Sequence, residues 1–249
     1  MSSARRGKIV VAADARALAE IAAERLLARV RQASGRAAVC LTGGSGPLGL
    51  YQLLTQEPYR SALPWPRVHW FMGDDRFVPA HDRLNNMGIA RRAFLDQVDV
   101  PPGNVHPIAT DEPSPEAAAR LYAAELARFY GSARLDRARP LFDLVLMGLG
   151  PDGHTASLFP GDPALDEQER WVVGIDEARL EPYVPRVTLT FPTLASTREM
   201  LFLVAGSGKR EILARVLAGD ELPASRARSD GDLVWLVDRA AAPEQHHAT

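Results

Sequence analysis

The segment GLGPDGHTASLFPG, from Gly148 to Gly161, carries four glycines and places a histidine two residues after an aspartate, directly behind the apolar run LFDLVLM. An imidazole group can take up a proton near neutral pH, so His154 is a candidate general base for activating water. Asp152 is close enough in sequence to orient that imidazole, or alternatively to cap a following helix. A packed or surface histidine is the simpler alternative for His154, and its place at a strand end favours chemistry.

Three other segments resemble this one in composition and position: TGGSG (Thr42 to Gly46), GDDR (Gly73 to Arg76) and GSGK (Gly206 to Lys209). Each follows an apolar run, and the carboxyl ends of parallel strands share one edge of an open sheet. Glycines let backbone N–H groups approach an anion, and the Arg and Lys side chains add positive charge. The pattern therefore predicts an anion site, most simply for phosphate, although turns between strand and helix are often glycine-rich without a ligand.

Other templates fit this chain less well. GSGPLG, from Gly44 to Gly49, matches the dinucleotide fingerprint, but Asp74 comes later than the acid that should support it. GSGKR has Arg210 where a P-loop needs Ser or Thr, and Pro47 disrupts a nucleophile elbow. The histidines have no paired spacing, so the sequence predicts no metal site.

The apolar runs alternate with helical patterns, which is typical of βα units around a mostly parallel sheet. We expect strands at residues 8–13, 37–42, 67–73, 141–147, 170–175, 186–191, 199–205 and 232–238. Helices are expected after Asp14, near Pro47, and over residues 85–98, 114–130 and 210–219. The predicted fold is an open, mostly parallel, Rossmann-like α/β sheet with helices on both faces. We expect one domain over residues 1–249 that ends in a short disordered tail.

Composition limits the classes of partner. Of the 249 residues, 46% are hydrophobic and the formal net charge is −2, so the overall field favours neither nucleic acid nor an anionic membrane. The single cysteine, Cys40, lies in an apolar run and is expected to be a buried thiol. The N-terminus has neither a secretory signal nor a membrane span, so we expect a cytoplasmic setting. The sequence predicts a monomer, with a weak dimer as the alternative.

Taken together, these segments resemble the 6-phosphogluconolactonases. The resemblance rests on GLGPDGHTASLFPG, TGGSGP, GDDR, PRVTLTFPTL, GSGKREIL and GDLVWLVDRAAA, which occur in family order from about Lys8 to Ala242. It implies a fold similar to the glucosamine-6-phosphate deaminases and, more distantly, the ribose-5-phosphate isomerases. The implied reaction is hydrolysis of 6-phospho-D-glucono-1,5-lactone in the oxidative pentose phosphate pathway, with a sugar phosphate as the small-molecule partner and no metal or organic cofactor.

The resemblance also implies roles for particular residues. His154 would be the general base, without a covalent intermediate, and Asp152 would support it. The 6-phosphate and the rest of the substrate would contact Thr42, Gly43, Gly44, Ser45, Asp74, Arg76, Gly150, Arg186 and Lys209. Backbone N–H groups or Arg76 would stabilise the oxyanion. Asp75 stands where the family usually has Glu, which leaves the role of that acid open.

Three alternatives remain open at this point. The deaminases have a loop that resembles DGHIAFNEPG, in which a Glu follows the His by five residues; Phe159 occupies that position here and cannot relay a proton. A sugar-phosphate sensor without catalysis should have lost the base, which this chain retains. A dinucleotide-dependent oxidoreductase rests only on the weak GSGPLG match. Arg186 as a surface cation and Lys209 as a solvated side chain are the non-functional alternatives for those two residues.

Overall fold

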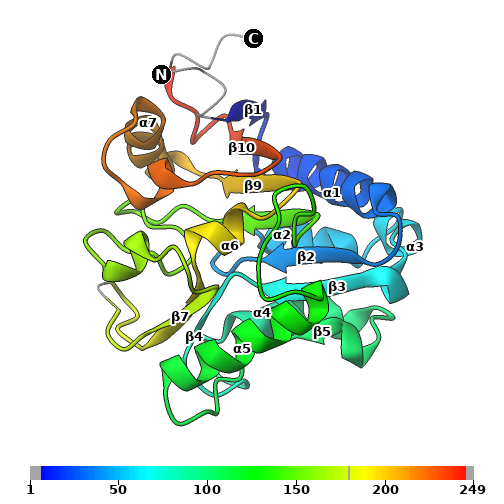
Figure 1. Ribbon diagram of the computed structural model, residues 1–249. Helices are drawn as coiled ribbons and strands as arrows, with labels where there is room; N and C mark the ends of the chain where they lie inside the picture. Colours follow the sequence, from blue (N-terminus) through cyan, green and yellow to red (C-terminus); the bar gives the residue numbers. More distant parts are fainter. Residues whose placement is uncertain (1–6, 179, 245–249) are drawn as a thin grey trace.

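Seven parallel strands form the central sheet of this protein. The computed structural model describes residues 7–178 and 180–244, so all but the first residue of the predicted tail lies outside the described residues. The strands are β1 (Lys8–Ala12), β2 (Ala37–Leu41), β3 (Val68–Met72), β5 (Val105–His106), β6 (Leu144–Met147), β9 (Glu199–Val204) and β10 (Asp232–Asp238). Their order across the sheet is β1-β10-β9-β6-β2-β3-β5, and every neighbouring pair is parallel (Figure 1). The predicted mostly parallel α/β fold is confirmed.

Burial explains which strands occupy the middle of the sheet. Every residue of β2, β6 and β9 is buried, as expected for apolar runs covered on both faces. Cys40 is one of these buried residues, and its thiol is free, as predicted. The two-residue strand β5 extends the sheet beyond β3 and was not predicted, because a run of two residues carries no periodic signal.

The two longest of the described helices begin at the capping residues that the sequence predicts, whereas two short helices, Tyr59–Ala62 and Phe191–Ala195, were not predicted. The helices are α1 (Ala15–Gln32), α2 (Leu48–Leu54), α3 (Tyr59–Ala62), α4 (Asn86–Ala93), α5 (Pro115–Tyr130), α6 (Phe191–Ala195) and α7 (Arg210–Ala218). Asp14 accepts the N–H of Ala17 at 2.8 Å, and Ser114 accepts that of Ala117 at 3.2 Å. Helix α4 is shorter than predicted: Phe94 has φ −155° and its buried ring packs on Tyr51.

A second, antiparallel sheet contains three short strands, two of which the sequence predicted without distinguishing them from the main sheet. It consists of β4 (Asp74–Arg76), β8 (Arg186–Leu189) and β7 (Val172–Ile175), in that order. The segment GDDR was predicted as a strand-end loop, but after Gly73 the chain pairs with β8 instead, and Leu189 N–H donates to the Gly73 carbonyl at 2.9 Å. Local sequence patterns cannot reveal this pairing, because its partners lie more than a hundred residues apart.

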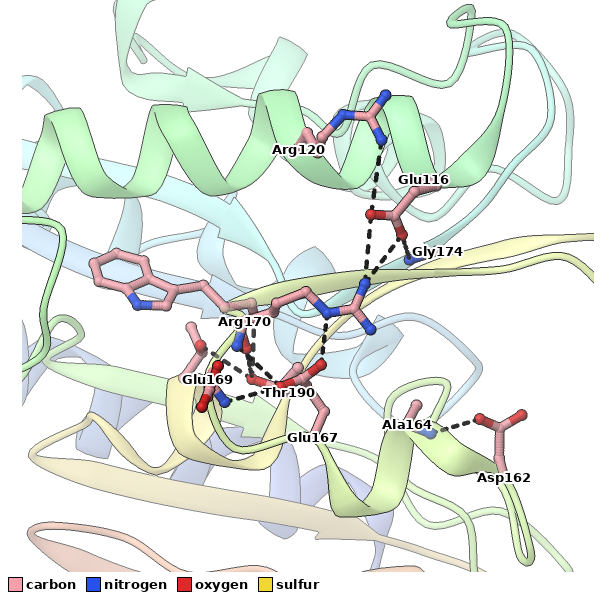
Figure 2. A network of polar contacts seen from close by, with 11 residues as sticks. Glu116, Arg120, Asp162, Ala164, Glu167, Glu169, Arg170, Gly174 and Thr190 are labelled. Atoms are coloured by element: carbon pink, nitrogen blue, oxygen red, sulfur yellow. Dashed lines mark hydrogen bonds and ion pairs between the residues drawn. The ribbon is translucent and has the colours of Figure 1, made fainter.

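Helix α5 fixes the position of the small sheet. The carboxylate of Glu116, in the first turn of α5, accepts bonds of 3.4 Å from Arg170 and from the N–H of Gly174 (Figure 2). Arg170 also bonds Glu167 at 2.5 Å. A Cβ at Gly174 would lie 2.5 Å from the backbone nitrogen of Glu116, so only glycine permits this close approach. The small sheet is therefore packed against α5, and this packing also places Arg186 on β8.

Candidate active site

The four glycine-rich segments meet at one edge of the central sheet. They follow β2, β3, β6 and β9, which are consecutive neighbours in the strand order β9-β6-β2-β3. A cavity of about 340 Å³ opens there. Most of the predicted site residues line it: Thr42, Gly43, Gly44, Ser45, Asp74, Arg76, Gly150, His154, Arg186 and Lys209. Asp152 is the exception, because it lies behind His154 and is not part of the cavity wall.

His154 and Asp152 form a hydrogen-bonded pair. His154 Nδ1 lies 2.5 Å from Asp152 Oδ1, which also accepts the backbone N–H of His154 at 3.0 Å. Burial raises the pKa of Asp152, but the hydrogen bonds from His154 outweigh it and hold this pKa below its ordinary value. Because an ionised carboxylate only accepts, Nδ1 carries a proton, and in the neutral ring the lone pair is therefore on Nε2. Asp152 therefore orients the imidazole and does not cap a helix.

Glycine at position 150 makes room for the imidazole. A Cβ at Gly150 would lie 2.0 Å from Nδ1 of His154, so no other residue fits without displacing the ring. The N–H of Gly150 donates to the His154 carbonyl at 2.8 Å, which closes the loop on itself. The loop thus supplies both the histidine and the space in which it lies.

Positive charge is concentrated on the small sheet. Arg76 and Arg186 are directly opposite each other in the antiparallel pairing of β4 with β8. Arg186 is only 3% exposed; its Nη2 donates to the Pro182 carbonyl at 2.7 Å, while Nε and Nη1 have no partner among the described residues. Burial and the charge of Arg76 lower the pKa of Arg186 to about 10. Arg186 is thus a buried cation and not a surface one, and two of its donors are left without a partner among the described residues.

The model of one protein family matches most of this chain. Residues 13–235 match the family model described as glucosamine-6-phosphate isomerases/6-phosphogluconolactonase. The chain belongs to this family. Named 6-phosphogluconolactonases are among its relatives: the protein of Synechocystis is 40% identical over 83% of this chain and 84% of its own, and that of Streptomyces coelicolor is 40% identical over 95% and 94%. These relatives confirm the predicted family and the prediction of an enzyme of the lactone hydrolase class.

Solved structures agree with the fold of this family. The 6-phosphogluconolactonase of Thermotoga maritima aligns with a TM-score of 0.80 at 30% identity, covering 93% of this chain and 99% of its own. A monomeric glucosamine-6-phosphate deaminase has a TM-score of 0.77 at 23% identity, over 94% and 98% of the two chains. At that identity the second likeness concerns the fold alone, as the resemblance predicted.

Within this family fold, Phe159 lies beside the candidate base. Its buried ring packs on His154 with a centroid separation of 4.9 Å. The deaminase version of this loop, as recognised from the sequence, has a glutamate at the same position. In this chain the neighbour of the imidazole is therefore an apolar ring that cannot carry a proton.

Lys209 joins two of the glycine-rich segments. Its ammonium group donates to the Leu149 carbonyl at 2.8 Å. This bond connects the turn before α7 with the loop after β6. Burial lowers the pKa of Lys209, and the charge of Asp152 partly opposes this. Lys209 is thus a half-buried cation at the cavity, not a solvated side chain.

Asp75 supports the first turn of α4 and is not part of the cavity wall. It is 1% exposed and accepts the backbone N–H groups of Asn86, Met87 and Arg76 at 2.6, 3.1 and 2.8 Å, which fixes the first turn of α4. Burial raises its pKa to about 7, although these three hydrogen bonds act in the opposite direction. The short aspartate reaches the helix N-terminus without entering the cavity wall.

Ser157 and Asn86 are two of the polar cavity residues that the sequence did not predict. Ser157 donates to Asp74 Oδ2 at 2.7 Å, and Asn86 donates from Nδ2 to the Asp74 carbonyl at 3.0 Å. The Oδ1 atom of Asn86 is buried without a partner among the described residues, and a Cβ at Gly43 would lie 2.1 Å from it. Ser157 is three residues after His154, which was the available signal; nothing local marks Asn86.

The other histidines lie away from this cavity. His69 and His106, which are 37 residues apart in sequence, contact each other with Nδ1 and Nε2 at 2.9 Å, a pairing that their spacing did not predict. Across the described ranges, no group of three or more His, Cys, Asp or Glu side chains is arranged to hold a metal ion. In the same ranges, none of the helices has the length and apolar character needed to cross a membrane.

Proposed function

We propose that this chain hydrolyses 6-phospho-D-glucono-1,5-lactone to 6-phospho-D-gluconate, the lactone-opening step of the oxidative pentose phosphate pathway. The observation that carries the proposal is one cavity lined both by a histidine that Asp152 orients and by the cations Arg76, Arg186 and Lys209, with two Arg186 nitrogens left without a partner among the described residues. The named relatives support the substrate. A lactone is an activated ester, so water and a base are sufficient and no covalent intermediate is needed.

His154 is the general base in this proposal. Nε2 removes a proton from water while the water oxygen attacks the lactone carbonyl carbon. The imidazolium that forms is stabilised by Asp152, which already bonds Nδ1. When the bond from that carbon to the ring oxygen breaks, His154 returns the proton to the leaving oxygen. The protein is thereby regenerated, and the net reaction adds one water to the lactone.

The 6-phosphate is held by the cations of the cavity. Arg186 supplies Nε and Nη1, Arg76 supplies charge from the neighbouring strand, and Lys209 extends from the turn before α7. Backbone N–H groups between Thr42 and Ser45 contribute further donors. Binding energy from this remote phosphate fixes the lactone ring against His154, which makes the attack effectively unimolecular.

A coupled assay tests this function. The lactone is generated in place from glucose 6-phosphate, and its opening is compared for the wild type, His154→Asn and a blank without enzyme, because the lactone also opens spontaneously. We expect the wild type to exceed the blank greatly and the variant to approach it. If the wild type only matches the blank while 6-phosphogluconate still raises its Tm, the chain binds sugar phosphates without hydrolysing the lactone.

A further inference from the structure

Asp74 is a buried carboxylate held from two directions in the cavity wall. Its side chain accepts the hydroxyl of Ser157 through Oδ2, and its backbone carbonyl accepts Asn86. Asp74 is 6% exposed and Ser157 is 2% exposed, so water does not replace this bond readily. None of the described residues donates a hydrogen bond to the other oxygen, Oδ1. Oδ1 is therefore left without a donor from the described residues on a side chain that lines the cavity.

Asp74 does not pair with the arginine next to it. In the β4–β8 pairing Asp74 is opposite Thr188 and Arg186 is opposite Arg76, so Asp74 and Arg186 are diagonal neighbours on the small sheet. The charge of Asp74 also opposes the lowering of the Arg186 pKa by burial and Arg76. Yet no ion pair joins them within the described residues, and two Arg186 nitrogens remain without partners. A carboxylate beside such a guanidinium gains a charge-assisted hydrogen bond by rotating towards it. In this structure Asp74 Oδ2 instead accepts the hydroxyl of Ser157.

The backbone next to Ser157 is conformationally strained. Ala156, immediately before it, has φ +49° and is the one described residue other than glycine with positive φ. A side chain in this region strains the backbone, so the surrounding structure must hold it there. The N–H of Ser157 donates to Thr188 Oγ1 at 3.3 Å, and Thr188 is the residue opposite Asp74 in the β4–β8 pairing. The backbone at Ala156 and the bond to Thr188 thus both help to direct the Ser157 hydroxyl at Asp74.

We propose that Ser157 is a positioning residue: it prevents Asp74 from neutralising Arg186, and it leaves Asp74 Oδ1 free to accept a hydrogen bond from a hydroxyl of the sugar ring. This inference rests on the proposed function and extends it to the selection of a polyhydroxylated, phosphorylated substrate. One serine hydroxyl thereby keeps an acceptor for the sugar and a cation for the phosphate available in the same cavity.

A double-mutant cycle with Ser157→Ala and Asp74→Asn tests the proposal. Inorganic phosphate is titrated calorimetrically into each protein, and KM and kcat are measured with the lactone. In Ser157→Ala, Asp74 rotates onto Arg186; we expect phosphate affinity to fall and KM to rise about tenfold, the effect of one hydrogen bond to a charged group, with a much smaller change in kcat. With Asp74→Asn also present, the charge that blocks Arg186 is gone, and phosphate affinity should return to that of Asp74→Asn alone.

A matched control separates this role from simple loss of a buried hydroxyl. Ser196 is 1% exposed, and its Oγ accepts the Leu141 N–H at 3.0 Å away from the cavity. Ser196→Ala should lower Tm but leave KM and phosphate affinity unchanged. The proposal is overturned if Ser157→Ala behaves like this control, or if its effect simply adds to that of Asp74→Asn. A wild type that binds phosphate but fails to open the lactone contradicts the function instead, and the phosphate titrations still decide the role of Ser157.

Discussion

Arg76 and Arg186 are directly opposite each other across the antiparallel strands β4 and β8, beside the cavity that contains His154. Like charges in this relationship destabilise a sheet. Burial adds to the cost at Arg186, because two of its nitrogens have no partner in the described part of the chain. An anion bound between the strands and the glycine-rich loops relieves both costs. The folded protein is therefore strained electrostatically at the place where the substrate phosphate is proposed to bind.

Replacing Arg186 should improve stability and impair binding together. Arg186→Met keeps much of the volume and removes a buried, incompletely bonded charge, so Tm should rise by about 2–4 °C. Loss of two charged donors should raise KM about 100-fold while kcat changes less. Steady-state kinetics and thermal unfolding measure the two effects. The control is Arg215→Met, which removes an exposed arginine on α7 that pairs with Asp220 and should leave KM unchanged. A lower Tm in Arg186→Met would contradict the proposed electrostatic strain.

Neutralising Asp152 should reduce kcat and spare KM. Asp152→Asn retains the size of the side chain but removes the charge that stabilises the imidazolium, so kcat should fall by about 100- to 1,000-fold. The coupled assay measures this directly. Asp220→Asn at the protein surface is the matched control and should retain wild-type turnover. Near-normal kcat in Asp152→Asn would show that His154 does not need this partner.

Gly150→Ala should displace the imidazole. The added methyl would lie 2.0 Å from His154 Nδ1, so the ring has to leave its bond with Asp152 and kcat should fall at least about 100-fold, as for other small misplacements of reacting groups. Gly103→Ala is the control, because no atom lies within 4 Å of a Cβ there. Unchanged turnover in Gly150→Ala, measured in the same assay, would mean that the ring position is not critical.

Stability should decrease in mild acid because of His69. Burial, together with the charges of His106 and Arg36, lowers the pKa of His69 from an ordinary 6.5 to about 4, and Glu125 opposes this only in part. The unfolded chain therefore takes up a proton at higher pH than the folded protein does. The contribution of His69 to the free energy of unfolding is complete above pH 6.5 and is lost as the pH falls towards 4.

Denaturant unfolding between pH 8 and pH 4 measures this dependence. His106 adds a further loss of stability in acid, because burial lowers its pKa as well. The charge of Arg128 also lowers this pKa, and the hydrogen bond to Glu125 raises it only in part. His69→Gln should flatten the curve between pH 6.5 and 4. His81→Gln, at an exposed position, should not change it. An unaltered slope in His69→Gln would show that other groups cause the acid sensitivity.

Much of the site follows from the sequence because its determinants are local. Asp152 and His154 are two residues apart, so a turn brings them together whatever surrounds it. The loops after β2, β3, β6 and β9 meet because strands in a parallel sheet end at one edge, and the apolar runs identify those strands. The capping residues Asp14 and Ser114 act within a single helical turn, and both were predicted correctly.

The remaining features depend on contacts between distant segments. The antiparallel β4–β8 pairing brings Arg186 beside Arg76, Ser157 bonds Asp74 from 83 residues away, and His69 meets His106. None of these relationships leaves a periodic trace in the sequence, because each depends on how the small sheet and the helices pack on the main sheet. Short-range backbone preferences and hydrophobic patterning thus determined the candidate base and its loop. Only long-range packing decided which charged side chains line the cavity beside it, and that Arg186 is buried there with two nitrogens lacking a partner among the described residues.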